Sequence, residues 1–178
     1  MRCFVACWPD DATRSRLDDV ARAAFGRNPL ARRVRPENLH LTLAFIGELP
    51  QSMACEVCRA MAELTITPFT WCIDRLGRFD RANIVWAGGA DESRLSELAD
   101  RVRTGLRALE VRFDRKPFAA HVTLLRDLPA PRGALEPGQA IESIEPIEPI
   151  GWPIGAARLL ASERDADGLV RYRLVEPD

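Results

Sequence analysis

The amino-acid sequence predicts an α+β protein of two related lobes, each built on a β-sheet. Two observations lead to this fold class. Segments with the spacing of strands and of helices occur in mixed order along the 178 residues. A four-residue pattern also occurs twice, as His40-Leu-Thr-Leu43 and as His121-Val-Thr-Leu124. Because a basic residue and a proline precede each copy at the same distance, as Arg35-Pro36 and Lys116-Pro117, the pattern indicates an internal duplication.

The first third of the chain reads as strand, helix and strand. Residues 2–8 form an apolar run typical of a buried strand. Apolar residues then recur on one helical face between Leu17 and Phe25, and Gly26 is suited to end this helix. Residues 39–46 are predicted to form the strand that carries the first histidine, which Gly47 ends.

The middle of the chain continues the alternation of helices and strands. The spacing of methionine, valine and leucine over residues 53–64 predicts a second helix, and strands follow near 69–77 and 83–88 with a hairpin turn between them. The clearest helical pattern covers residues 92–109. Residues 119–126 are predicted to form the strand that carries the second histidine.

The last third is rich in turn-forming residues. Prolines and three glycines over residues 129–153 predict loops and at most a short edge strand. Strands near 155–162 and 169–175 are expected to pair around the turn at Asp165–Gly168.

The charge balance excludes a broadly basic nucleic-acid surface. The net charge is −1 and the pI is near 6.2, whereas proteins that bind backbone phosphates carry a basic patch. A small local basic site is still compatible with this balance. Cations near the two motifs are candidates for steering an anionic ligand, namely Arg32, Arg33, Arg35, Arg112, Arg115 and Lys116.

The cysteines favour a reducing, cytoplasmic compartment, because five is an odd number and a chain of this length needs no disulfide framework. Cys55 and Cys58 form a CxxC without a second CxxC or a nearby histidine, so we interpret them as packing residues. No apolar stretch approaches the roughly 18 residues of a membrane span. The apolar run from Cys3 to Trp8 is too short for a secretory leader.

The repeated pattern has the chemistry of an acid–base pair. It contains both histidines of the chain, and histidine titrates near neutral pH. Strand alternation places His40 with Thr42 on one face, and His121 with Thr123 likewise, with Cα atoms about 6–7 Å apart. Leu41, Leu43 and Phe45 are expected on the opposite face.

Other uses of two histidines fit less well. Zinc sites need three or four protein ligands, and no third histidine exists. A Ser-His-Asp triad uses one histidine and has no G-x-S-x-G segment here. General acid–base catalysis, with threonine hydroxyls donating to phosphate oxygens, fits best. The residues alone do not say which histidine is the acid.

Three segments carry a family resemblance: Arg2–Ala6, His40–Gly47 and Lys116–Arg126. They resemble the first strand and the two signature segments of the RNA 2′,3′-cyclic phosphodiesterases, also known as 2′-5′ RNA ligases, of the two-histidine phosphoesterase superfamily. The resemblance implies one domain over residues 1–178, made of two intertwined, pseudo-symmetric lobes. Each lobe would hold an antiparallel sheet flanked by helices, with the active-site cleft between the lobes and the motif strands facing each other across it.

The resemblance also implies roles. His40 would donate the proton to the leaving oxygen, and His121 would accept the proton of the attacking water. Thr42, Thr123 and Arg126 would bind the phosphate, without metal or cofactor. The implied partner of this monomeric enzyme is RNA with a terminal 2′,3′-cyclic phosphate, opened to a 2′-phosphomonoester, and the reverse reaction would be 2′-5′ ligation.

Alternatives remain at this point. The same fold would serve a small nucleotide 1″,2″-cyclic phosphate or a 2′-5′-linked oligonucleotide. A non-catalytic RNA-end binding module is a further alternative, which the intact motifs disfavour. Phe4, Phe45 and Phe118 are candidates for base stacking, although core packing is the simpler reading.

Overall fold

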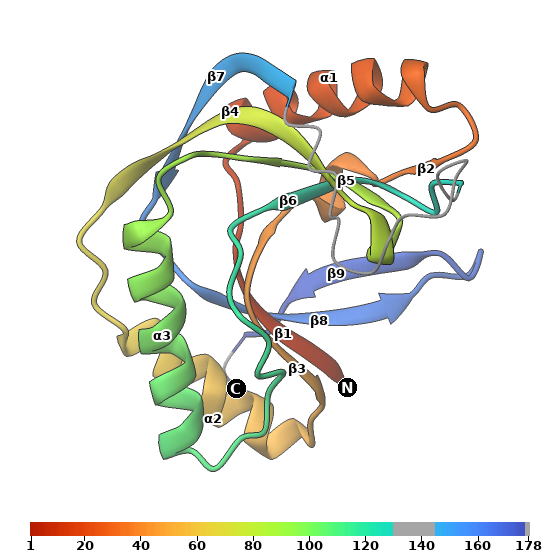
Figure 1. Ribbon diagram of the computed structural model, residues 1–178. Coiled ribbons are helices and arrows are strands. Elements are labelled where there is room, and N and C mark those ends of the chain that lie inside the picture. Colours follow the sequence, from red (N-terminus) through yellow and green to blue (C-terminus); the bar gives the residue numbers. More distant parts are fainter. Residues whose placement is uncertain (130–144, 177–178) are drawn as a thin grey trace.

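The computed structural model describes residues 1–129 and 145–176, which form one antiparallel sheet and three α-helices (Figure 1). The strand order is β7-β4-β5-β6-β3-β1-β8-β9, and β2 pairs with β6. The strands are β1 (Arg2–Cys7), β2 (Arg32–Arg33), β3 (Leu41–Glu48), β4 (Phe69–Phe79), β5 (Ile84–Gly88), β6 (Val122–Arg126), β7 (Glu145–Ile154), β8 (Arg158–Arg164) and β9 (Val170–Leu174). The helices are α1 (Asp11–Arg27), α2 (Gln51–Glu63) and α3 (Ser93–Ala108), with short 3₁₀ turns η1 (Pro36–Asn38) and η2 (Asp80–Ala82). The α+β class is confirmed.

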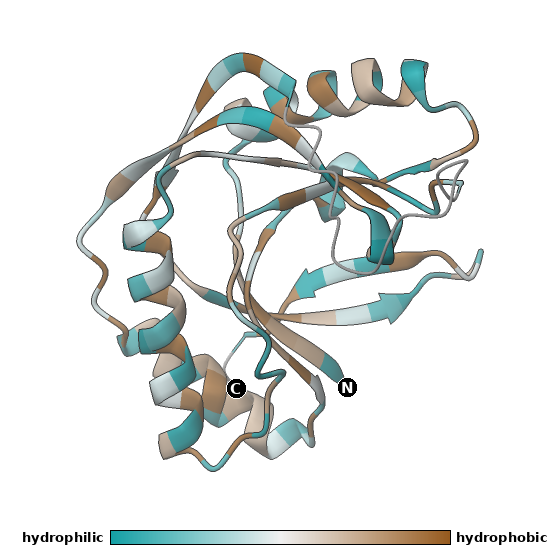
Figure 2. Cartoon of the chain, in the orientation of Figure 1, coloured by the Kyte–Doolittle hydropathy of each residue, from teal (hydrophilic) through white to brown (hydrophobic). Residues whose placement is uncertain are grey.

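Hydrogen bonds at its two ends fix where helix α1 begins and where it ends. Asp10 caps its start by accepting a hydrogen bond from the Thr13 amide at 2.7 Å. Its end lies beyond the predicted Gly26, because the Asn28 side chain donates to the Ala24 carbonyl and satisfies the last turn. Hydrophilic and hydrophobic residues both occur along each helix (Figure 2), as expected for helices with one apolar and one polar side.

The helices cover different parts of the sheet. Helix α1 packs against β6 and β7, whereas α2 packs against β8 and α3 against β3. Helices α2 and α3 also pack against each other and lie together at the lower left of Figure 1. The apolar side chains of the motif strands face this core, since Leu41, Leu43, Val122 and Leu124 are all buried. No helix in the described part of the chain has the length and apolarity needed to cross a membrane.

The sheet has two halves that meet at the motif strands. β7-β4-β5-β6 and β3-β1-β8-β9 join through the pairing of Leu41 with Val122. Read outward from this junction, each half starts with a motif strand, followed by the strand that precedes a helix, β1 or β5. The motif strands are therefore neighbours in one sheet rather than members of two sheets. The division into two pseudo-symmetric lobes stays a prediction.

The proline-rich segment differs from its prediction. Residues 145–154 form the ten-residue strand β7 rather than a loop or a short strand. Pro146, Pro149 and Pro153 are tolerated because β7 is an edge strand that pairs with β4 alone among the described strands. The part of the prediction that falls on residues 130–144 lies outside the described residues.

Gly77 provides a test of the packing around Trp86, which contacts Phe79. A Cβ at this position would lie 2.1 Å from Cζ2 of the buried Trp86. We expect Gly77→Ala to lower stability by about 1–3 kcal/mol through overpacking, seen as a fall of several degrees in thermal unfolding. Gly155→Ala is the matched control, because its Cβ would meet no atom within 4 Å. Equal melting temperatures for the two variants would show that Trp86 moves freely.

Candidate active site

A cavity of about 520 Å³ lies over the junction of β3 and β6. Its lining combines arginines, aromatic rings, and three of the four polar residues of the repeated motif, whereas His121 is not among the lining residues. The lining consists of Arg2, Arg32, Arg33, Arg35 and Arg126; Phe4, Phe45 and Tyr172; His40, Thr42 and Thr123; with Val34, Asn38, Ser162, Leu169 and Val170. A second, smaller cavity of about 220 Å³ lies between β4 and α3 and contains no histidine.

The register of β3 and β6 brings the two motifs together. Each histidine is the residue just before its strand, which begins later than predicted, at Leu41 or Val122. The histidine thus comes one residue before the Leu41–Val122 pair and the threonine one residue after it. An antiparallel register of this kind places each histidine opposite the threonine of the other strand, on the face away from the core. The two His-x-Thr arms are thus related by a local two-fold symmetry about the Leu41–Val122 pair.

The path of the chain before His40 opens this site. Arg32 and Arg33 pair with β6, and the Val34 amide donates to the Leu124 carbonyl at 2.8 Å. The chain then leaves β6, forms η1, and returns at Leu41. This excursion places Asn38 and His40 in the cavity wall.

A β-bulge in each motif strand moves one more side chain to the cavity. The pairing of β3 with β1 skips Leu43 and, further along, Ile46, and the pairing of β6 with β5 skips Leu124. A bulge reverses the alternation of faces beyond it. Phe45 and Arg126 therefore line the cavity together with the threonines. The prediction that Phe45 shares the core face with Leu43 was wrong for this reason, and its ring is 38% exposed.

Backbone carbonyls fix the orientation of both histidines. His40 Nδ1 lies 2.7 Å from the Asn38 carbonyl oxygen, and His121 Nδ1 lies 2.8 Å from that of Ala119. A carbonyl oxygen only accepts, so each Nδ1 carries the hydrogen. Nε2 is then the nitrogen on each ring that gains or loses a proton when the imidazole titrates.

The two Nε2 atoms have different surroundings. His40 Nε2 lies 3.0 Å from the Thr42 hydroxyl, so this His-x-Thr arm is closed by a hydrogen bond. His121 Nε2 makes no hydrogen bond to any residue that the structure describes, and its Thr123 lines the cavity.

Aromatic rings support both imidazoles. The His40 ring packs against Phe4 at 4.8 Å and edge-on against Tyr172 at 5.0 Å, both measured between ring centroids. The His121 ring packs edge-on against Phe79 at 5.1 Å, and Phe79 in turn contacts Trp86 at 5.3 Å. Phe4 therefore packs against His40, and Phe118 packs against the core, as the prediction of packing rather than base stacking expects.

Burial and positive charge favour the neutral form of both histidines. Burial lowers the pKa of His40 from 6.5 to about 4, and the nearby Arg126 and His121 add to this effect. Burial and Arg126 also lower the pKa of His121. The Glu92 carboxylate opposes the lowering at His121, whereas none of the charges found to act on His40 is negative.

The cavity arginines differ in whether a carboxylate neutralises them. Arg32 pairs with Asp127 at 2.8 Å, Arg33 with the buried Asp18, and Arg35 with Asp165 at 3.3 Å. Arg2 and Arg126 form no ion pair with any described residue, and of these two only Arg126 has a charge that acts on both histidines. Arg126 is thus the arginine best placed to meet an anion beside the motifs.

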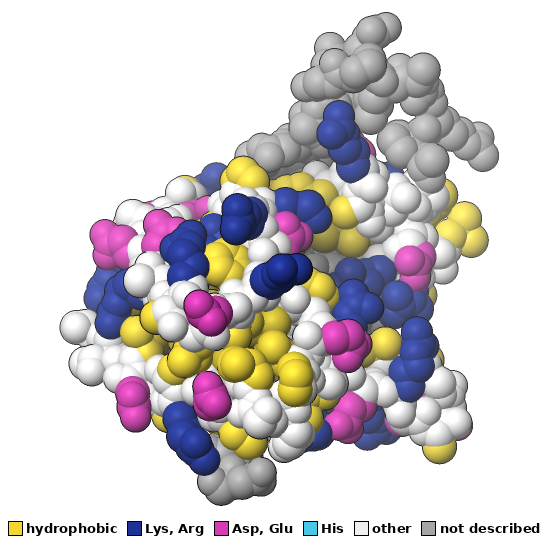
Figure 3. Space-filling view, turned by 90° about the horizontal axis from the view of Figure 1, so that it is seen from below, with side chains coloured by type: hydrophobic (Ala, Val, Ile, Leu, Met, Phe, Trp, Pro, Cys, Tyr) yellow, Lys and Arg dark blue, Asp and Glu magenta, His cyan; other side chains and the backbone are white. Residues whose placement is uncertain are grey.

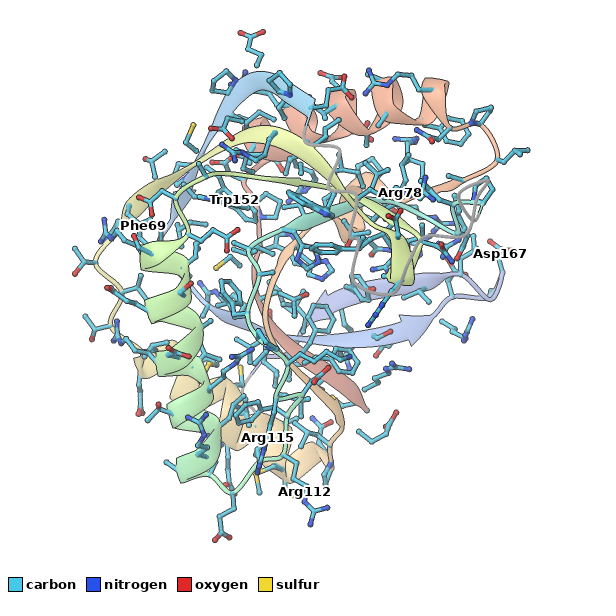
Figure 4. All side chains as sticks on the ribbon, in the orientation of Figure 1. Phe69, Arg78, Arg112, Arg115, Trp152 and Asp167 are labelled. Carbon is cyan, nitrogen blue, oxygen red and sulfur yellow. The ribbon has the colours of Figure 1, made fainter. Side chains whose placement is uncertain are left out.

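The cations before the second motif lie elsewhere. Arg112, Arg115 and Lys116 do not line the cavity. Arg112 and Arg115 lie beyond the C-terminal end of α3 (Figure 4), far from Asp167 at the tip of the β8–β9 hairpin. Basic and acidic side chains are also mixed over the face seen in Figure 3. These three cations are a charged surface rather than part of the candidate site.

Several residues that line the cavity were not predicted from the sequence. Asn38 and Tyr172 reach the cavity from η1 and β9, and Arg2 lies 5.1 Å from the centroid of the Phe45 ring. The position of Asn38, two residues before the histidine, was the one available signal. Cys55 and Cys58 are buried on α2, which agrees with packing. Across residues 1–129 and 145–176, no three His, Cys, Asp or Glu side chains cluster as metal ligands.

Comparisons with known proteins agree with this geometry. Residues 7–86 match the LigT-like phosphoesterase family. The RNA 2′,3′-cyclic phosphodiesterase of Thermus thermophilus is 30% identical over 192 residues, covering 99% of this chain and 88% of the relative. That of Archaeoglobus fulgidus is 34% identical over 129 residues, covering 71% and 72%. The crystal structure of Escherichia coli LigT complexed with 3′-AMP matches with a TM-score of 0.80 and 27% identity, covering 98% of this chain and 95% of that chain.

The fold, the paired motifs and these similarities define an enzyme of the phosphoesterase class. Within that class, the chain belongs to the LigT-like phosphoesterase family. The two relatives compared above are both RNA 2′,3′-cyclic phosphodiesterases.

The histidine environments can be tested by proton NMR. Because the chain has two histidines, single His→Ala variants assign both ring signals. We expect both to titrate below pH 6.5, with His40 at about 4. Inorganic phosphate should raise both midpoints, because a bound anion favours the imidazolium. A His40 midpoint at or above 6.5 in the free protein would contradict the buried, positively charged surroundings.

Proposed function

We propose that this protein hydrolyses the terminal 2′,3′-cyclic phosphate of RNA to a 2′-phosphomonoester. The observation that carries the proposal is the pair of His-x-Thr arms related across the Leu41–Val122 pair, beside an arginine without a carboxylate partner among the described residues. The relatives named RNA 2′,3′-cyclic phosphodiesterase support this substrate. We further propose that residues 1–178 act as one monomeric domain, with RNA ends as the partner.

The proposed reaction needs one proton acceptor and one proton donor. His121 Nε2 takes a proton from water as the water oxygen attacks phosphorus. The bond between phosphorus and the 3′ oxygen breaks, and the His40 Nε2–H gives its proton to that oxygen. The products are a 2′-phosphate and a 3′-hydroxyl, and the histidines exchange their proton through solvent before the next turnover.

The threonines and Arg126 are proposed to bind the phosphate. The hydroxyls of Thr42 and Thr123 donate to the non-bridging oxygens, whose charge grows as water attacks. Arg126 compensates the same charge. Thr42 already lies within hydrogen-bond distance of His40 Nε2, so phosphate binding exchanges that bond for one to the ligand.

The surroundings of the histidines support the assignment of roles. Once each group is in the required protonation state, a stronger acid gives its proton more readily and a stronger base takes one more readily. The uncompensated positive charges around His40 favour loss of its proton, whereas Glu92 stabilises the protonated form of His121. The negative phosphate then supplies the charge that keeps His40 protonated until the leaving oxygen needs the proton. The reverse sequence, with an RNA 5′-hydroxyl in place of water, would give 2′-5′ ligation.

The first test is turnover of RNA with a 2′,3′-cyclic end, in EDTA, with identification of the product ends. We expect His40→Ala and His121→Ala each to lose roughly 10²–10⁴-fold in kcat, the usual contribution of a positioned acid or base. Arg115→Ala is the control, because Arg115 lies away from the cavity. A 3′-phosphate product would reverse the leaving oxygen, and loss of activity in EDTA would contradict a metal-free reaction.

The second test is the pH dependence of the rate. Lowered pKa values of both free histidines place the alkaline limb of kcat/KM below pH 6.5, because the singly protonated pair disappears above the higher of the two values. Bound substrate is an anion and raises these values, so the alkaline limb of kcat should lie at higher pH. Coincident limbs in the two profiles would argue against an anion held between the histidines.

A further inference from the structure

Asn38 is a buried polar residue whose side chain the proposed reaction does not use. It ends the η1 turn and is 7% exposed. Its backbone carbonyl accepts the hydrogen bond from His40 Nδ1. Ala119 does the same for His121 and has no polar side chain. The second motif therefore shows that the backbone bond alone orients a histidine, so the Asn38 amide has another purpose.

The amide of Asn38 pairs with the free edge of β9. Its Nδ2 donates to the Val170 carbonyl at 2.8 Å, and its Oδ1 accepts from the Tyr172 amide at 3.1 Å. These are the two bonds that the N–H and C=O of one residue in a neighbouring parallel strand would make. β9 otherwise pairs with β8 alone among the described strands. One side chain thus replaces a strand over residues 170–172.

The same segment of β9 covers His40. Tyr172 packs edge-on against the His40 ring, and the two rings and Phe4 contact one another pairwise at 4.8–5.0 Å. Val170 and Tyr172 also line the cavity. A strand held at one edge by β8 and at the other by Asn38 keeps this aromatic wall in place.

We infer that Asn38 is a positioning residue, whose side-chain amide clamps β9 so that Tyr172 shields and orients the imidazole of His40. The activity part of this inference rests on the proposed function, and the shielding part does not. Without the amide, residues 170–172 lose their hydrogen bonds to η1, while the Arg35–Asp165 pair still links the turn of the hairpin to the chain before η1, and water reaches the His40 ring. The charges that act on His40, those of Arg126 and His121, stay in place.

The test compares Asn38→Ala and Asn38→Leu with Asn28→Ala. Leucine fills the space of the amide without its hydrogen bonds, which keeps the test valid if the alanine variant folds poorly. Asn28 is the matched control, because its amide donates to a backbone carbonyl at the end of α1, where Asn28 does not line the cavity. The readouts are thermal unfolding, NMR titration of both histidines, and kcat and KM on cyclic-ended RNA.

We expect the folded Asn38 variants to raise the midpoint of His40 toward 6.5 while that of His121 stays unchanged. Their kcat should fall roughly tenfold or more with little change in KM, as for a misplaced reacting group. Combining Asn38→Leu with Tyr172→Leu should cost less than the sum of the single losses, because both act through one contact. Asn28→Ala should change none of these quantities.

Two results would overturn the inference. One is an unchanged His40 midpoint in a folded Asn38→Leu protein, and the other is an equal shift of both histidines, which would indicate general loosening. If the wild-type protein does not hydrolyse the cyclic phosphate, the proposed function fails, and the titration still decides whether the clamp exists.

Discussion

The pairing of Leu41 with Val122 is the constraint on which the site depends. It joins the two halves of the sheet and fixes the register of the motif strands. A slip of one residue would turn the histidines and threonines into the core and expose leucines to the cavity. Burial of Leu41, Leu43, Val122 and Leu124 opposes such a slip, because each apolar side chain exposed would cost about 1.5–3 kcal/mol. The core thus sets the spacing of the two His-x-Thr arms.

The two motif strands are nearly symmetric, but the residues beside their histidines differ. Bulges at equivalent positions deliver Phe45 on one strand and Arg126 on the other. Asn38 stands two residues before one histidine and Ala119 before the other, and the Ala120 amide donates to Glu92 at 3.1 Å. The two strands position two similar imidazoles, and the different residues around them give the two histidines different proton affinities. In the proposed reaction, separate donor and acceptor roles for the two copies of one motif therefore need changes only around the histidines.

The sequence predicts the parts of the site that depend on local pattern. The repeated His-x-Thr reveals both arms, because strand alternation is a local property. It does not reveal Phe45 in the cavity, since a bulge has no signature in this chain beyond the leucine that it displaces. The contacts of Asn38 with β9 join residues more than 130 positions apart, and no local pattern records them. Strand β7 is longer than the short edge strand predicted, because an edge strand tolerates prolines along its whole length.

Those prolines affect whether two copies of the protein can pair through the edges of their sheets. An exposed sheet edge invites pairing with another chain, and a row of free N–H groups is what makes such pairing possible. Pro146, Pro149 and Pro153 remove donors along β7. At the opposite edge, β9 carries Arg171 and Arg173, and charged side chains discourage the same pairing. The two outer strands of this long sheet are thus both poor templates for aggregation.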